Sequence, residues 1–172
     1  MKKYLLIILS IAAVLSVSCN KTDSENKKDY PDEKFEYVFF EPVLKWNAGV
    51  QEIRSEMSKM EDWVEDTELS GENDLRYSNK KNSAPNVSYS FEKEKMTECS
   101  ITYLLCNDKF DQMKDDWART LNLTWQQKEI LGHTVYEASC RSKECRIFAQ
   151  QGDASGFNYM SLNFIYETRF FD

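Results

Sequence analysis

Carboxylate side chains are the most abundant groups in this sequence that could carry out chemistry. They occur as adjacent pairs at Glu61/Asp62, Glu65/Asp66 and Asp115/Asp116. Two carboxyl groups placed across a cleft can hydrolyse a glycosidic bond. These pairs fall on predicted helix surfaces, where charged side chains normally face solvent. The pattern therefore favours a noncatalytic protein, with a carboxylate-based hydrolase as the alternative.

One histidine and five cysteines are the other reactive groups. Nucleophilic catalysis needs a nucleophile, a base and a group that orients the base. His133 follows Gly132 in a predicted turn, and no catalytic or phosphate-binding motif surrounds it. The cysteine spacings do not match Cys-x2-Cys, and one histidine supplies at most one zinc ligand. We therefore predict no metal and no cofactor.

Aromatic side chains are present in surplus, with four Trp, nine Tyr and ten Phe. Most are expected to fill the core, but Trp63 and Trp125 fit the predicted apolar faces least well. Aromatic residues dominate the contact energy of binding surfaces. We predict that these two tryptophans are exposed and contact a protein or a glycan.

The elements that position these residues follow from hydrophobic periodicity. Helical spacing recurs at 50–64, after a predicted N-cap at Asn47, and at 110–121, after a predicted capping box at Asp108. Alternating apolar residues predict strands near 75–77, 87–91, 99–105, 135–140, 145–149 and 160–166. Alternation at 35–40 predicts either a further strand or an ordered segment packed on the domain.

A helix followed by three strands thus occurs twice, over 47–106 and 108–168. Two such halves sharing one sheet would bury more surface than either half alone. We predict an α+β fold with a mainly antiparallel sheet and two amphipathic helices on one face. The repeated order favours two tandem helix-plus-three-strand halves. This order resembles the layout of secreted beta-lactamase-inhibitor-like domains, a likeness of fold alone.

The N-terminus is typical of a secretory signal. Two lysines follow Met1, and Tyr4–Val17 is apolar apart from two serines. These 14 residues are too few to span a hydrocarbon core of about 30 Å as a helix. The run Leu15-Ser16-Val17-Ser18-Cys19 resembles the lipobox of bacterial lipoproteins. The resemblance implies cleavage before Cys19, acylation of Cys19 and membrane anchorage. Asn20, which is not Asp, further implies the outer rather than the inner membrane.

Three regions follow along the chain: a signal peptide at 1–18, the lipidated Cys19 with a flexible tether at 19–34, and a single α+β domain at 35–172. Nine of the fifteen residues in 20–34 are charged, so this segment cannot offset its ordering entropy by burial. Loss of 1–18 lowers the basic residues from 22 to 20 against 29 acidic ones, which takes the net charge from -7 to -9. Such a chain is not expected to bind nucleic acid. The lipid on Cys19, and not charge, would hold it at the membrane.

Acylation of Cys19 would leave four cysteines in an oxidising compartment, where disulfides form. Cys99 and Cys106 are seven residues apart on one predicted strand, about 23 Å, which is beyond disulfide reach. Cys140 and Cys145 could staple a short hairpin. The alternative is two long-range bonds between the halves.

Together these features predict a lipid-anchored cell-envelope protein at the periplasmic or surface face of the outer membrane. Its expected role is that of a noncatalytic binding or interaction module for an unknown protein or glycan. The alternatives are the envelope hydrolase mentioned above and a purely structural lipoprotein.

Overall fold

The structure, a computed structural model, describes residues 36–81, 85–154 and 157–167. The predicted signal peptide, Cys19 and the tether lie outside these residues. The helical elements are α2 (Val50–Met57), η1 (Asn107–Lys109), α3 (Phe110–Leu121) and η2 (Arg141–Lys143). The strands are β1 (Trp63–Glu65), β2 (Asp74–Asn79), β3 (Pro85–Glu92), β4 (Lys95–Leu104), β5 (Gln126–Ile130), β6 (His133–Cys140), β7 (Cys145–Ala154) and β8 (Phe157–Tyr166).

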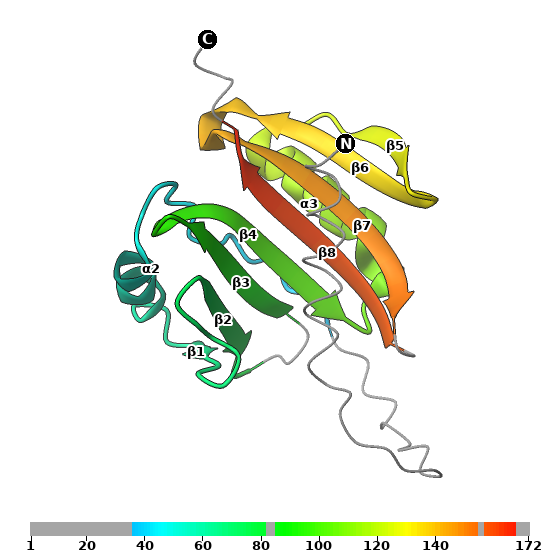
Figure 1. Cartoon of the computed structure of the whole chain (residues 1–172). Helices are drawn as coiled ribbons and strands as arrows, with labels where there is room; N and C mark the ends of the chain where they lie inside the picture. Colours follow the sequence, from blue (N-terminus) through cyan, green and yellow to red (C-terminus); the bar gives the residue numbers. More distant parts are fainter. Residues whose placement is uncertain (1–35, 82–84, 155–156, 168–172) are drawn as a thin grey trace.

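All eight strands belong to one antiparallel sheet in the order β1-β2-β3-β4-β8-β7-β6-β5 (Figure 1). Strands that follow one another pair as hairpins within β1–β4 and within β5–β8. The two groups meet at the centre, where β4 pairs with β8 and Ile101 lies opposite Leu162. The predicted α+β fold with an antiparallel sheet is confirmed.

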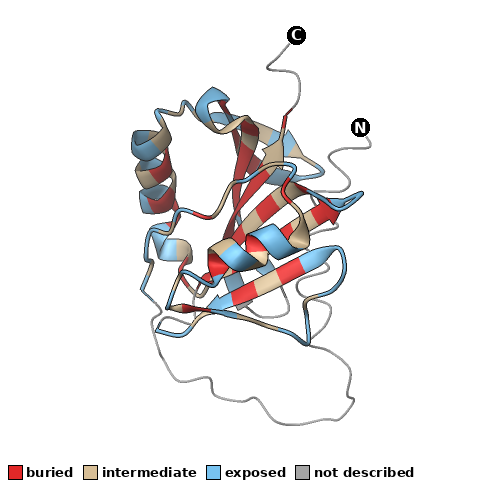
Figure 2. Ribbon diagram, turned by 90° about the vertical axis from the view of Figure 1, so that its left-hand side faces the viewer, coloured by how far each residue is buried: buried red, intermediate tan, exposed pale blue. Residues whose placement is uncertain are grey.

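One face of the sheet is apolar because alternating residues of successive strands align across it. Tyr89 of β3 lies opposite Cys99 of β4, which lies opposite Phe164 of β8, and all three are fully buried. Figure 2 shows buried positions alternating with half-buried and exposed ones along the strands. The Tyr89 hydroxyl donates a hydrogen bond to Met57 Sδ of α2 at 3.2 Å. The Trp117 ring of α3 packs on Phe164, with ring centroids 5.0 Å apart. Met57 and Trp117 thus belong to the same hydrophobic core cluster as these three strand residues.

The opposite face of the sheet is mostly polar. Ser88 lies opposite Ser100, which donates a hydrogen bond to Asn163 Oδ1 at 2.5 Å. Farther across the same face, Arg146 Nη1 donates to Glu137 Oε1 at 3.2 Å. Because successive side chains of a strand point to opposite faces, the strands show alternating apolar and polar residues in the sequence.

Residues 36–49 contain no helix or strand, and we call this segment the strap. Tyr37 packs edge-on against Tyr103 of β4, and Trp46 stacks on Tyr166 of β8, with centroids 5.2 and 5.6 Å apart. The strap therefore crosses the core face over the two central strands. Of the two predictions for 35–40, the strand is wrong for the described residues and the packed segment is confirmed.

Several element boundaries differ from the sequence prediction. Asn47 is not the cap of α2, because its φ is 63° and the helix begins after Gly49. The helix also ends at Met57, since Val64 pairs with Ser78 in β1. Residues 107–109 form the short helix η1, so Asp108 does not cap α3.

The strands β1 and β5 were not predicted. β1 has only three residues, and β5 reads Gln-Gln-Lys-Glu-Ile, without apolar alternation. Residues 50–104 therefore contain one α-helix and four strands, and so do residues 110–166, whereas the sequence predicted three strands after each helix.

Candidate functional site

A groove of about 390 Å³ opens beside β1, where the strap approaches the end of β2. We call it the edge groove. Its apolar lining consists of Val38, Phe39, Phe40, Met60, Trp63 and Pro85. Its polar lining consists of Glu61, Asp62, Asn79 and Lys81. A concave surface that combines apolar side chains with a few polar groups is the usual form of a binding site.

Trp63 forms one wall of the edge groove as the first residue of β1. Its ring packs on Phe40 of the strap, with centroids 4.2 Å apart and planes tilted by 42°. Only 9% of the residue is exposed. The prediction of an exposed Trp63 is therefore wrong, because the strap covers the ring. Trp63 nevertheless contributes to the groove, as a wall and not as a platform.

Two apolar residues of the strap stay open to solvent at the groove: Val38 is 50% exposed and Phe39 is 37% exposed. The Tyr103 hydroxyl holds this part of the strap by donating to the Val38 carbonyl at 3.1 Å. Burial raises the pKa of Tyr103, so its hydroxyl remains a proton donor at any physiological pH. The Phe39 ring packs on Trp117 at a centroid distance of 4.9 Å. The exposed apolar side chains are thus held in place and not on a free loop.

The polar rim is organised by the ends of β1 and β2. Lys81 Nζ lies 2.8 Å from Asp62 Oδ1, and the Lys80 amide donates to the Asp62 carbonyl at 2.7 Å. The Lys81 amide donates to Asn79 Oδ1 at 2.9 Å. Surface ion pairs of this kind contribute little to stability. The rim charges can therefore exchange partners with a ligand at small cost.

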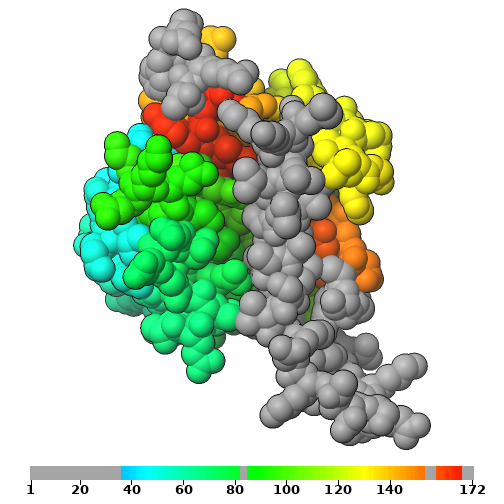
Figure 3. All heavy atoms as spheres, in the orientation of Figure 1, coloured from blue at the N-terminus to red at the C-terminus, as the bar shows by residue number. Residues whose placement is uncertain are grey.

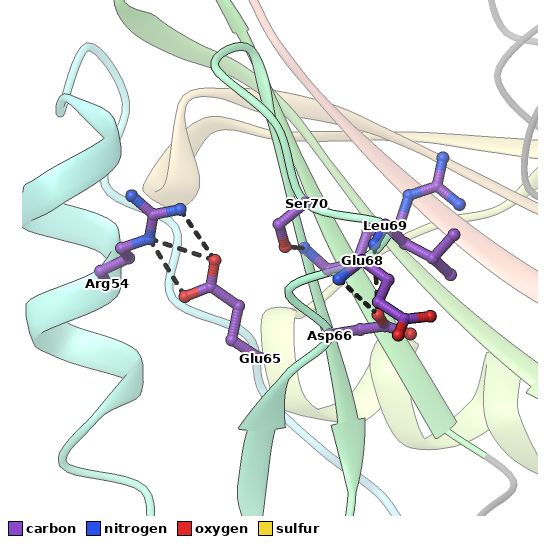
Figure 4. A network of polar contacts seen from close by, with 7 residues as sticks. Arg54, Glu65, Asp66, Glu68, Leu69 and Ser70 are labelled. Carbon is purple, nitrogen blue, oxygen red and sulfur yellow. Dashed lines mark hydrogen bonds and ion pairs between the residues drawn. The ribbon is translucent and has the colours of Figure 1, made fainter.

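The other carboxylate pairs serve the fold (Figure 4). Arg54 of α2 makes a forked contact with Glu65, donating from Nε at 3.0 Å and from Nη2 at 2.8 Å. Asp66 Oδ1 accepts the amides of Glu68 and Leu69, each at 3.2 Å, and so closes a turn. On α3, Asp115 is exposed and Asp116 pairs with Arg119. Of the three predicted pairs, Glu61/Asp62 lines the edge groove, and there Asp62 is bound to Lys81.

Trp125 lies far from the edge groove. It directly precedes β5, at the opposite end of the sheet from β1 (Figures 1 and 3). The residue is half-buried, and its Nε1 donates to the Lys114 carbonyl of α3 at 3.0 Å. A smaller, polar groove of about 290 Å³ lies at this end, lined in part by Asn122, Gln126 and Glu137. The two predicted aromatic contacts therefore do not form one surface.

The four cysteines of the domain are buried thiols. Cys140 ends β6 and lies directly opposite Cys145, the first residue of β7, as the predicted hairpin requires. Cys99 lies within β4, and Cys106 follows its end. The predicted bond between Cys140 and Cys145 remains a prediction, because both side chains are thiols here.

The signal that sequence reasoning missed is the strap. The alternation at 35–40 was visible, but its role in shaping a groove depends on contacts with Trp63 and Trp117, which are distant in the chain. His133, considered above as a possible ligand or base, is exposed at the start of β6.

Within the described residues, no group of three or more His, Cys, Asp or Glu side chains is placed to hold a metal ion. The helices of that same part of the chain are all too short or too polar to cross a membrane. No known protein family, curated protein or solved structure matches this chain.

Proposed function

We propose that this chain is a lipid-anchored protein of the cell envelope and acts as a noncatalytic binding module through its edge groove. The observation that carries the proposal is the pair of half-exposed apolar residues, Val38 and Phe39, held beside Trp63. Adjacent exposed apolar side chains beside a hollow are typical of an interaction surface.

The fold proposed for this role has both helices on the same face of the sheet and two helix-plus-four-strand halves. The first point is supported by the contacts of Met57 and Trp117 with Tyr89 and Phe164, because the strand register aligns those two partners through Cys99. The second is supported by the order of elements, in which α2 precedes β1–β4 and α3 precedes β5–β8.

The anchor is supported by the lipobox-like run ending at Cys19. A tether of fifteen residues would have a reach of about 20 Å. The domain would then stay close to the membrane while remaining free to turn. Outer-membrane location follows from the residue after Cys19, through the same resemblance.

The ligand that fits the edge groove best is an apolar side chain of a protein. A sugar ring would stack on an open aromatic face, but the Trp63 ring packs on Phe40 and the Phe39 ring packs on Trp117. The open surface is instead supplied by Val38 and Phe39. Hydrolysis by Glu61 and Asp62 is less well supported, since Asp62 is bound to Lys81 at 2.8 Å.

The anchor is tested by Cys19→Ala. We expect the variant to leave the membrane fraction and to lack the mass of the acyl chains. Wild-type protein whose Cys19 peptide carries no acyl mass would refute anchorage by Cys19.

The groove is tested by photocrosslinking in intact envelopes, with Val38→Asp compared against Leu131→Asp. Leu131 is 69% exposed between β5 and β6 and serves as a matched control at the other end of the sheet. We expect Val38→Asp to abolish a crosslinked protein band that Leu131→Asp preserves. Equal bands in both variants, or a purely glycan-derived adduct, would contradict a protein ligand in this groove.

A further inference from the structure

The register of the sheet brings two cysteines into direct contact. Cys140 and Cys145 are cross-strand partners at the end of the β6–β7 hairpin, and both are at most 2% exposed. Residues directly opposite in an antiparallel pair have Cα atoms about 4.5–5.5 Å apart. This separation lies within the range that a disulfide requires.

Cys99 does not lie opposite a cysteine in the sheet, because its cross-strand neighbours are Tyr89 and Phe164. Cys99 on β4 lies opposite Phe164 of β8, while Cys145 on β7 lies opposite Tyr166 of the same strand. Cys99 and Cys145 are thus separated by one whole strand and are also offset by two residues along it. Their Cα atoms are therefore more than about 9.6 Å apart, too far for a disulfide. Cys106 follows Leu104, the last residue of β4, whereas Cys145 lies level with the N-terminal half of that strand. Of the pairings left open by the sequence, the strand register favours the bond between Cys140 and Cys145.

We propose that Cys140 and Cys145 form a disulfide across the β6–β7 hairpin, that Cys99 and Cys106 remain thiols, and that the bond holds the turn on which the strap is anchored. One cysteine thiolate attacks the disulfide of an oxidant, either a small-molecule or a protein disulfide, and releases a thiol. The second thiolate then attacks the mixed disulfide, forms the Cys140–Cys145 bond and releases the second thiol. Two electrons and two protons pass from the hairpin to the oxidant. The cellular version of this step rests on the proposed envelope location, which would supply the oxidant.

The turn closed by this bond holds the strap at two points. Trp46 Nε1 donates to the Lys143 carbonyl at 2.5 Å, and Lys143 Nζ binds Glu41 Oε1 at 2.7 Å. Lys143 is the last residue of η2, between the two cysteines. The same strap supplies Val38, Phe39 and Phe40 to the edge groove. A bond between Cys140 and Cys145 therefore limits the motion of a turn that holds the groove wall.

The order of events follows from burial. Burial raises the pKa of the Cys145 thiol, so the folded, reduced protein presents very little thiolate to an oxidant. The bond should consequently form while the hairpin is still accessible during folding. Oxidation of the refolding chain should be fast, and oxidation of the folded, reduced chain should be slow.

The connectivity can be read from a tryptic digest. The full mature chain is reduced, unfolded and refolded with a glutathione redox buffer, and then digested without reduction. Trypsin cleaves after Arg141, Lys143 and Arg146, so the bond would join peptide 129–141 to peptide 144–146. We expect this linked pair, with Cys99 and Cys106 recovered as thiols. A bond to Cys99 or Cys106, a bond between chains, or four free thiols would overturn the proposal.

The link to the strap is tested by hydrogen exchange of residues 41–48. We expect these amides to exchange several-fold more slowly in the oxidised than in the reduced protein, and Cys145→Ala to match the reduced protein in either buffer. Cys99→Ala, which removes an equally buried thiol, should retain the difference between the two buffers. Equal exchange in the oxidised and reduced wild type would overturn the role of the bond in holding the strap. Because neither measurement uses a ligand, a membrane or an envelope fraction, failure here is distinguishable from failure of the proposed function.

Discussion

Replacing Trp63 by Ala tests whether the strap and β1 form one packed unit. About 150–250 Å² of an aromatic side chain is removed from water on burial, and Trp63 is only 9% exposed. At about 25 cal/mol per Å², this gives an upper bound of about 4–6 kcal/mol. Because the groove lets water enter the vacated space, we expect the low end of the range for such truncations, about 3 kcal/mol. The melting temperature should fall by about 10 °C.

Urea unfolding followed by circular dichroism measures this loss, and the neighbouring Val64→Ala serves as the control. Val64 projects to the other face of β1 and is 41% exposed. Its truncation should change stability by no more than about 0.5 kcal/mol. Trp63→Phe should recover most of the loss, since a phenyl ring can still pack on Phe40. If Trp63→Ala were no more destabilising than Val64→Ala, the packing of the strap on β1 would be wrong.

Three further predictions concern the fold around the groove. The buried Tyr77 hydroxyl has no hydrogen-bond partner among the described residues, and burial raises the pKa of Tyr77 to about 12. The contribution of Tyr77 to the free energy of unfolding should therefore be fully present below pH 10 and be lost as the pH rises from 10 towards 12, because the unfolded chain loses this proton first. Tyr77→Phe should weaken this alkaline loss of stability in unfolding curves without lowering the free energy of unfolding at pH 7. Arg54→Met breaks the forked contact with Glu65, in which the Arg54 side chain is 36% exposed and the Glu65 side chain 20% exposed. It should lower the free energy of unfolding in urea by at most about 1 kcal/mol. A loss of several kcal/mol would contradict a solvated ion pair. Once formed, the bond between Cys140 and Cys145 closes a six-residue loop, so its reduction should lower the free energy of unfolding by about 2 kcal/mol, measured with and without reductant.

The central strands could be predicted because the alternation of apolar and polar residues is visible within each strand. In β3, Val87, Tyr89 and Phe91 alternate with serines, and this period of two is sufficient to identify a strand with one buried face. β1 and β5 could not be found in this way. β1 is too short to show a period, and β5 is an edge strand whose polar residues face solvent on much of their surface.

The candidate site was predicted only in part. Trp63 was singled out because it fits no helical face, and it does line the groove. Its burial was missed because the covering ring belongs to Phe40, more than twenty residues earlier and in a segment without regular structure. The exposure of Val38 was likewise hidden in an alternating pattern that suggests a strand. Periodicity detects elements, but it does not detect which irregular segment packs on them.

The strap explains how one groove can depend on both parts of the sheet. It contacts β1 through Phe40, α3 through Phe39, and the two central strands through Tyr37 and Trp46. The strap therefore has contacts in both groups of strands, and the pairing of β4 with β8 joins these two groups. A ligand that binds the strap must then favour the paired sheet over any opened form, and it stabilises the whole domain in proportion to the logarithm of its concentration. The binding proposed for the edge groove would therefore depend on the same contacts that link the strap to both groups of strands.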